Sequence, residues 1–134
     1  MGLTNEEREA IVNYRLEKAY ETLLDAQEVA KIKKWHIVAN RLYYACFYAV
    51  SALLIKNNFS AQTHSGVFAL LGFHFVLKGI VSKEQNKLYR NLFDLRQMGD
   101  YDDFAVVEEN DIMPLLEPAK QFIEKIEQLI NENK

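Results

Sequence analysis

The sequence predicts an all-α protein, an up-and-down bundle of about five helices. Apolar residues recur at helical spacing in each long segment, whereas no segment shows the two-residue alternation of a half-buried strand. Capping patterns and Asn or Gly residues mark the ends of these segments. With 134 residues, of which 49% are hydrophobic, the chain is expected to form a single domain over residues 1–134.

The first predicted helix runs from Thr4 to about Lys31. Thr4 and Glu7 form a capping-box pattern, in which each side chain can accept a hydrogen bond from the other residue's backbone N–H. An apolar stripe lies opposite a charged face, as expected for an outer helix that covers a core. The stripe consists of Val12, Leu16, Ala19, Leu23, Ala26 and Ala30.

The second predicted helix, residues 35–56, is apolar over most of its circumference. Its charge-free run from Leu42 to Ile55 is shorter than the ~20 residues of a membrane span, so we interpret it as a buried helix wrapped by others. At ~100° per residue, its polar side chains gather on about one third of the circumference. Because a buried Arg or Asn needs a partner or a cleft, this polar stripe predicts a site. The stripe consists of Asn40, Arg41, Tyr44, Tyr48 and Ser51.

The third predicted helix covers about residues 63–78 and has almost no polar face. Asn57 and Asn58 are expected to end the preceding helix, and Gly79 to end this one, because these residue types tolerate the left-handed conformation of a C-terminal cap. His74 lies among the apolar residues of this helix and is expected to be a core histidine with a hydrogen-bond partner.

Two more helices complete the predicted bundle. The fourth begins with a capping-box pattern at residues 82–85 and ends near Gly99. An acidic loop follows, and the last helix is expected over about residues 111–131. Pro114 suits its first turn, where a missing N–H costs nothing, whereas Pro118 should bend its start.

Arg96 is the most informative single residue. On its helix it falls between Tyr89 and Leu92, inside the apolar arc, so it should point inward. A guanidinium keeps its proton, and its burial therefore requires a carboxylate or several oxygen acceptors. One interpretation is a structural ion pair, with Asp100 or Asp102. The other is a phosphate-binding or transition-state-stabilising arginine beside the polar stripe.

Few other residues could carry chemistry. His64 starts the third helix, where free backbone N–H groups could also hold an anion, and it is a candidate base. Neither it nor His74 has a Cys or His partner at metal-ligand spacing, so no metal site and no cofactor are predicted. Cys46 is the single cysteine and lies on the apolar side of its helix, where it is a poor nucleophile.

Charge and composition limit the partners. Sixteen basic and nineteen acidic residues give a net charge of -3, so the chain lacks the broad basic face of sequence-independent nucleic-acid binding, although a local basic groove stays open. The N-terminus has no apolar signal core. A cytoplasmic protein without a membrane partner is the expectation.

Three segments, in this order and at this spacing, resemble the HEPN domain. They read NRLYYACFYAVSALL, THSGVFALLGFHFV and LYRNLFDLRQMGDYDDF, and the resemblance extends over about residues 9–130. It implies an α-helical bundle that commonly dimerises. Many members are metal-independent ribonucleases, often toxins encoded beside a minimal nucleotidyltransferase. Their signature is an Arg followed, after four to six residues, by a His, with a Tyr two residues beyond the His in the toxin subgroup.

Arg96 matches the Arg of that signature, but the His does not carry over. The corresponding positions hold Tyr101, Asp102 and Asp103. A tyrosine with a pKa near ~10 is a much weaker general base at neutral pH than an imidazole. The adjacent carboxylates would also repel an RNA phosphate.

The leading hypothesis is therefore a binding and regulatory module for RNA or a nucleotide, with a nucleotidyltransferase as partner in a toxin-antitoxin-like system. Its ligand-binding residues would be Asn40, Arg41, Tyr44, Tyr48, Arg96 and Asp100. A toxin-like ribonuclease that uses Arg96 with His64 or Tyr101 is the alternative. A purely structural interaction bundle is the second alternative, in which Arg96 would be locked in an ion pair and no pocket would open.

A homodimer is also predicted. The second and third helices both lack a polar face, and one small bundle can hardly cover both. We expect Leu70, Phe73 and Leu77 to contribute to the apolar patch that remains exposed.

Overall fold

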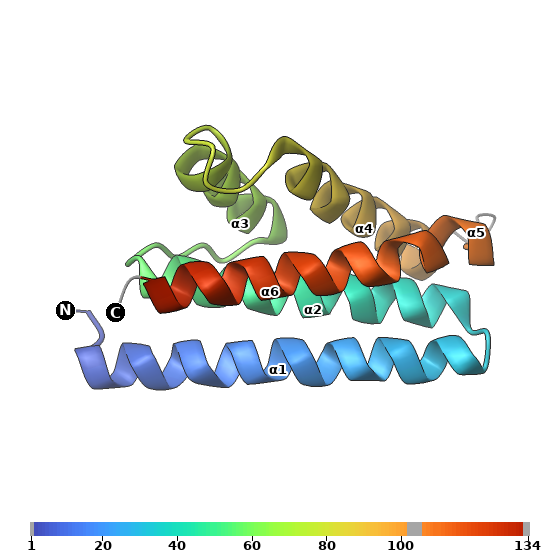
Figure 1. The fold of residues 1–134 in the computed structure, drawn as a ribbon, viewed down its shortest axis with the longest axis horizontal. Coiled ribbons are helices and arrows are strands. Elements are labelled where there is room, and N and C mark those ends of the chain that lie inside the picture. The colour runs from blue at the N-terminus through green and yellow to red at the C-terminus, as the bar shows by residue number, and fades with distance from the viewer. Residues whose placement is uncertain (1, 102–105, 133–134) are drawn as a thin grey trace.

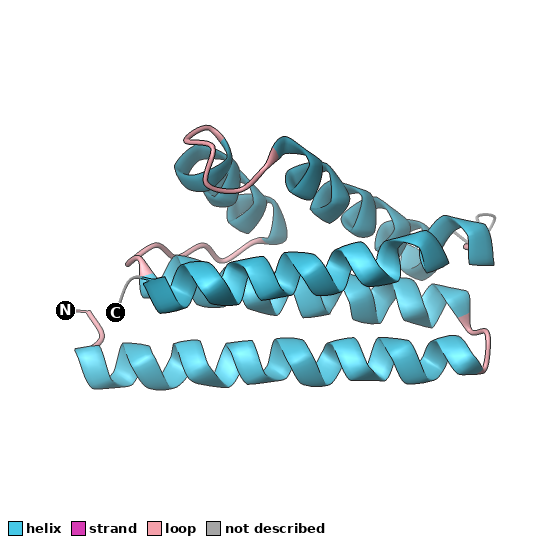
Figure 2. Ribbon diagram, viewed as in Figure 1, coloured by secondary structure: helices cyan, strands magenta, loops and turns pink. Residues whose placement is uncertain are grey.

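The computed structural model describes residues 2–101 and 106–132, and the side chain of Tyr101 lies outside this description, as do Asp102 and Asp103. The all-α prediction is confirmed: within these ranges every regular element is a helix (Figures 1 and 2). The elements are α1 (Asn5–Lys31), α2 (Trp35–Lys56), α3 (His64–Leu71), the π-helical turn η1 (Gly72–Val76), α4 (Lys83–Tyr101), α5 (Glu109–Ile112), the 3-10 turn η2 (Met113–Leu115) and α6 (Leu116–Glu132).

Helix α2 lies at the centre of the bundle. It contacts α1, α3, α4, α5 and α6, and α1, α2 and α6 run alongside one another while α3 and α4 lie on the other side of α2 (Figure 1). Its small apolar residues, among them Ala45, Ala49 and Ala52, are fully buried. Small side chains let neighbouring helices approach closely, which explains how one helix can be covered on nearly all sides.

By length and composition alone, α2 could also cross a membrane. It has 22 residues and a mean hydropathy of 1.3, but 67% of the apolar window is buried inside the protein. Burial of that extent is typical of a helix that other helices wrap. It agrees with the interpretation of residues 35–56 as a core helix.

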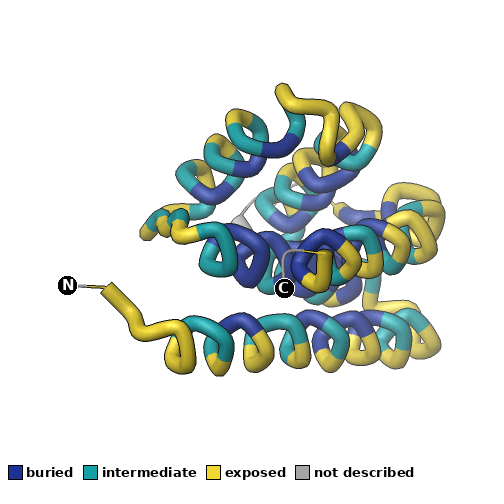
Figure 3. Tube along the Cα trace, turned by 60° about the vertical axis from the view of Figure 1, so that its left-hand side comes forward, coloured by how far each residue is buried: buried dark blue, intermediate teal, exposed yellow. Residues whose placement is uncertain are grey.

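Helix α1 covers one side of α2 with a single face (Figure 3). Thr4 and Glu7 form the predicted capping box: the Glu7 N–H donates to Thr4 Oγ1 at 3.0 Å, and the Thr4 N–H donates to Glu7 Oε1 at 2.8 Å. Val12, Ala19 and Ala26 of the predicted stripe are buried completely. The opposite face is exposed, so α1 is the amphipathic outer helix that the sequence predicts.

The third helix differs from the prediction at its C-terminal half. After Leu71 the chain forms a π-helical turn, in which the Leu77 N–H donates to the Gly72 carbonyl five residues back. This wider turn rotates the following residues relative to an α-helix. His74 is therefore half-buried and stacked on Phe59, with ring centroids 3.9 Å apart, and the expectation of a core histidine is wrong. Gly79 ends the segment at φ 75°, as predicted.

The last two helices also begin and end slightly differently. Gly99 lies inside α4 and does not cap it; a Cβ at this position would come within 3.2 Å of the His36 Cβ, so the glycine allows α4 to approach α2 closely. The predicted helix over 111–131 is divided into α5, η2 and α6. Pro118 lies in the first turn of α6 and has no N–H to bond the Pro114 carbonyl, which explains the interruption before it.

Candidate functional site

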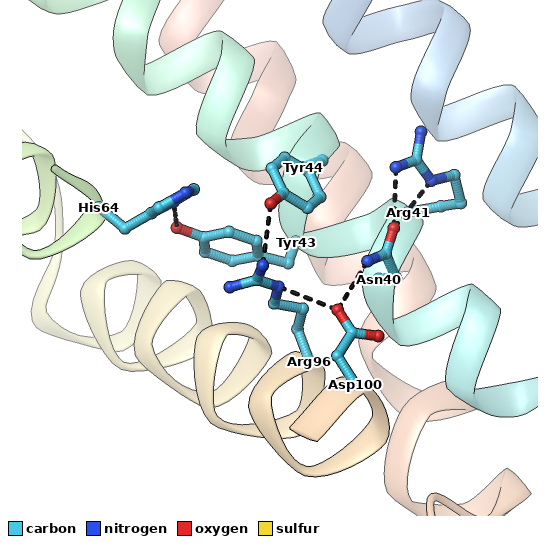
Figure 4. Close-up of polar contacts among 7 residues, drawn as sticks. All are labelled: Asn40, Arg41, Tyr43, Tyr44, His64, Arg96 and Asp100. Carbon is cyan, nitrogen blue, oxygen red and sulfur yellow. Dashed lines mark hydrogen bonds and ion pairs between the residues drawn. The ribbon is translucent and has the colours of Figure 1, made fainter. Parts of the chain in front are cut away.

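Arg96 points inward from α4 toward α2, as predicted, and only 8% of it is exposed (Figure 4). Its Nε donates to Asp100 Oδ2 at 3.2 Å, and its Nη2 donates to the Tyr44 hydroxyl at 3.0 Å. The guanidinium carbon lies 5.2 Å from the centroid of the Tyr44 ring. The ion pair that the structural interpretation predicted is therefore present, and it lies directly against the polar stripe of α2.

Asp100 links Arg96 to the N-terminal part of that stripe. Its Oδ2 also accepts a hydrogen bond from Asn40 Nδ2 at 2.9 Å. Asn40 Oδ1 in turn accepts from Arg41 Nε at 3.0 Å and Nη2 at 2.8 Å. The structure thus brings five of the six proposed ligand-binding residues into one connected cluster, which we call the Arg96 cluster. It comprises Asn40, Arg41, Tyr44, Arg96 and Asp100 (Figure 4).

Tyr48, the sixth of these residues, lies next to the Arg96 cluster without a hydrogen bond to it. Its ring centroid is 6.0 Å from that of Tyr44, and the Lys18 ammonium lies 5.4 Å from its centroid. One turn further along α2, Ser51 Oγ accepts a hydrogen bond from Arg15 at 2.6 Å. The polar stripe therefore continues from α4 toward α1, with cations of α1 at its far end.

His64 reaches the same region from the start of α3. Its Nδ1 lies 2.7 Å from the Tyr43 hydroxyl, and its ring centroid lies 5.8 Å from that of Tyr44. Partial burial and then the positive charge of Arg96 lower the pKa of His64 below the ordinary value of 6.5. The imidazole is consequently neutral at physiological pH.

The hydrogen bond to Tyr43 determines where the imidazole proton sits. Burial is the main reason that the pKa of Tyr43 is raised to about 12, so the hydroxyl keeps its proton at neutral pH. When this hydroxyl donates to Nδ1 of His64, the imidazole hydrogen lies on Nε2. In that tautomer the outer nitrogen is a hydrogen-bond donor, which suits contact with an oxygen anion better than proton abstraction.

The backbone at the start of α3 is already capped. Thr63 Oγ1 accepts a hydrogen bond from the Gly66 N–H at 2.9 Å. The side chain of His64 is therefore what α3 contributes to the Arg96 cluster, whereas one of the N–H groups expected to hold an anion is bound within the chain.

Tyr43 is the residue of this site that sequence reasoning missed. It lies on the apolar side of α2, is buried, and stacks on Tyr89 with ring centroids 5.8 Å apart and planes at 8°. The Tyr89 hydroxyl is buried and has no well-formed hydrogen bond among the described residues. Burial is the main cause that raises the pKa of Tyr89, and the nearby Tyr43 raises it further. A helical wheel places Tyr43 with the core, and only the crossing of α3 over α2 brings His64 to it.

The described residues offer no evident metal centre. No three His, Cys, Asp or Glu side chains in the described part of the chain come together with the geometry of a metal site. Cys46 is fully buried, and burial raises the pKa of its thiol far above the ordinary range. The described residues therefore give no support for metal chemistry or for a reactive thiol.

Fold and site together define a class: an all-α bundle in which a buried arginine of one helix is hydrogen-bonded to the polar stripe of the central helix. Residues 12–129 match the HEPN domain. The chain belongs to the HEPN domain family, as the resemblance in the sequence predicts.

Relatives agree with this assignment. A UPF0332 protein of Thermotoga maritima is 40% identical over 128 residues, which cover 96% of this chain and 97% of that protein. A Methanocaldococcus jannaschii protein named "Putative toxin MJ0142" is 26% identical over 88% of this chain and 81% of its own length. The crystal structure of TT1696 from Thermus thermophilus has the same fold, with a TM-score of 0.75 at 17% identity; the match covers 88% of this chain and 97% of TT1696.

Proposed function

We propose that this protein is a regulatory HEPN module that binds a phosphate group of RNA or of a nucleotide at the Arg96 cluster. The observation that carries the proposal is the position of Arg96. It donates a hydrogen bond to Tyr44, and its charge contributes to the lowered pKa of His64. A guanidinium and a neutral imidazole that donates from Nε2 are both hydrogen-bond donors suited to phosphate oxygens.

Asp100 acts as an internal partner in this proposal. Its side chain is 25% exposed and lies one helical turn from Arg96, so it neutralises the guanidinium while water still reaches it. An incoming phosphate would compete with this carboxylate for the donors of Arg96. Two cations, Arg41 and Arg96, belong to the Arg96 cluster, and their positive charge favours an anionic ligand.

A nucleotidyltransferase partner is the second part of the proposal. It rests on the HEPN resemblance, since such proteins are often encoded beside a minimal nucleotidyltransferase, and on the relative whose name describes a toxin. Co-expression with the product of a neighbouring nucleotidyltransferase gene should give a complex that co-purifies through size-exclusion chromatography. Separate elution of the two proteins would remove this part of the proposal and leave ligand binding unaffected.

Binding of fluorescein-labelled single-stranded RNA, followed by anisotropy in EDTA, tests the first part. Arg96→Ala should weaken binding by about 10- to 100-fold, because a hydrogen bond to a charged group contributes about 1.5–3 kcal/mol. Arg8→Ala removes the same charge near the N-terminus of α1 and serves as the matched control. If both variants bind as the wild type does, or if the wild type does not bind, Arg96 is only part of a structural ion pair.

A further inference from the structure

Two small hollows adjoin each other at the end of the molecule where α1 begins and α2 ends (Figure 1). Ile55, Phe59 and Ser60 line both of them, so together they form one groove between α1 and the segment 57–61 that follows α2. Arg15 lines one hollow and Arg8 the other, and we call the whole the Arg15 groove. No residue of the Arg96 cluster lines it, so it is a separate place on the surface.

The two arginines give this groove its charge. Arg8 and Arg15 are seven residues apart on α1, which places them about 10 Å apart along the helix axis. Each donates one hydrogen bond to a neutral side chain, and neither takes part in an ion pair among the described residues. Glu9 follows Arg8 in the sequence, but it pairs with Lys56 and lines neither hollow. Because a guanidinium has five N–H donors, both arginines keep donors for an incoming carboxylate.

Ser51 is a second polar group that lacks a partner in this groove. Its side chain lines the groove although the residue is only 8% exposed, and its Oγ accepts a hydrogen bond from Arg15 Nη1 at 2.6 Å. Among the described residues, no group accepts the hydrogen of this hydroxyl. Since buried hydroxyl groups normally donate as well as accept, an acceptor is missing beside Arg15. A carboxylate bound by Arg15 would supply it.

The lining between the two arginines is apolar and mainly aliphatic. Leu54 and Val67 are buried, and Ile55 is half-buried. Phe59 is the one aromatic residue among the described residues of the lining, and its ring already stacks on His74, with centroids 3.9 Å apart and planes at 16°. Single-stranded RNA binds to grooves that offer aromatic faces to successive bases. The Arg15 groove therefore suits carboxylates on an aliphatic segment better than it suits RNA.

We propose that the Arg15 groove binds an acidic segment of a partner protein. One carboxylate of the segment pairs with Arg15 and accepts from Ser51, an aliphatic side chain packs on Ile55, and a second carboxylate pairs with Arg8. An extended chain advances about 3.3 Å per residue, so acidic residues three positions apart span the roughly 10 Å between the two arginines. The proposal goes beyond the proposed function, because it concerns another ligand at another place.

NMR titration with a synthetic peptide tests the proposal. The probe is a short peptide with an aspartate and a glutamate three positions apart and two leucines between them. Its matched probe carries asparagine and glutamine instead of the two acids. The acidic peptide should shift the Nε–H signal of Arg15 and the backbone amide signals of residues 57–61. The amide peptide should bind at least tenfold more weakly, because it cannot form hydrogen bonds between charged groups.

Three variants locate the binding. Arg15→Gln removes the charge while it keeps a donor for Ser51, and it should weaken binding of the acidic peptide by about 10- to 100-fold. Arg8→Gln should also weaken binding, and it decides the question if Arg15→Gln melts at a much lower temperature. Lys31→Gln is the matched control. It removes an exposed charge of α1 about 24 Å from Arg15 along the axis, well beyond the screening length of about 8 Å at physiological salt, and should bind as the wild type does.

A uridylate hexamer, titrated in the same way, separates the two classes of ligand. Shifts of the groove signals by the acidic peptide that Arg15→Gln or Arg8→Gln weakens, and Lys31→Gln does not, support the proposal. Equal binding of the acidic and the amide peptides, equal binding by all three variants, or no shift with the acidic peptide overturns it. If the hexamer alone shifts these signals, the groove binds RNA and the proposal is wrong.

Discussion

At the scale of single residues, the protonation of His64 gives the sharpest test of the site. Burial and the Arg96 charge both disfavour the imidazolium, so His64 should titrate below 6.5 in an NMR experiment on its ring protons. Arg96→Ala removes one of the two causes and should move the midpoint upward, whereas Arg8→Ala should leave it unchanged. A wild-type midpoint above 6.5, or no response to Arg96→Ala, would contradict the placement of His64 beside Arg96.

The same shift makes a small contribution to the pH dependence of stability. The folded state binds this proton less readily than the unfolded state does. The contribution of His64 to the free energy of unfolding is therefore fully present above pH 6.5 and is lost as the pH falls below that value. A bound phosphate would reverse the local field. We therefore expect a saturating anionic ligand to raise the His64 midpoint.

The absence of RNA cleavage is a further prediction at this scale. The purified protein should show little or no cleavage of labelled single-stranded RNA in EDTA, because the Tyr43 hydroxyl occupies Nδ1 of His64 and, when it donates there, the imidazole proton lies on Nε2 and blocks proton abstraction. Tyr101→His alone should not create full activity, since Asp102 and Asp103 still place negative charge beside the motif position. If the wild type cleaves RNA and both Arg96→Ala and His64→Ala do not, the protein is a ribonuclease.

At the scale of elements, two glycines around the π-helical turn should respond to alanine in opposite directions. Gly72 has helical φ and ψ angles of −60° and −50°, and nothing lies within 4 Å of an added Cβ, so Gly72→Ala should stabilise the protein by about 0.5–1 kcal/mol. Gly79 has a φ of 75°, so Gly79→Ala should destabilise it by about 1–2 kcal/mol. Urea unfolding measures both changes, and effects of the same sign would refute the assigned backbone geometry.

The order and type of the helices follow from sequence patterns because apolar periodicity and caps act locally. The capping box at Thr4 and the left-handed Gly79 are examples in which a short pattern suffices. The π-helical turn has no such pattern. The π-helical turn rotates the chain within the segment 63–78. An α-helical wheel therefore placed His74 in the core incorrectly.

The candidate site was predictable only where one helix presents its residues together. Arg96 could be placed inward from its own helix, and Asn40, Arg41 and Tyr44 could be placed on one stripe of another. Tyr43 could not, because its role depends on how α3 crosses α2. Crossings between helices follow from packing of the whole bundle, which the spacing of residues along one helix does not encode.

At the scale of the whole molecule, exposed apolar side chains near η1 are where the predicted homodimer can be tested. Phe73 is 63% and Leu77 77% exposed near η1, and the predicted third member, Leu70, is half-buried. Exposed apolar side chains that form a contiguous patch are typical of an interface. Sedimentation velocity at micromolar concentration should show a homodimer of the wild type.

A matched pair of variants locates the interface. Leu77→Glu should shift the protein to the monomer by placing a charge in the contact, whereas Leu24→Glu, at a position of α1 that is 59% exposed, should leave the dimer intact. A wild-type monomer, or equal behaviour of the two variants, would show that the surface near η1 is not where two copies meet.

The central position of α2 has a consequence for how the protein opens in solution. Its amide protons lie among five neighbouring helices and should exchange with deuterium only when the whole chain unfolds. Helix α3 rests mainly on α2, so its amides should exchange through a local opening of lower free energy. That opening would carry His64 away while Tyr44 and Arg96 stay in place, and the site would form and disperse on the timescale of this motion. Exchange mass spectrometry should show fast exchange in α3 that an RNA ligand slows, and exchange in α3 as slow as in α2 would contradict this expectation.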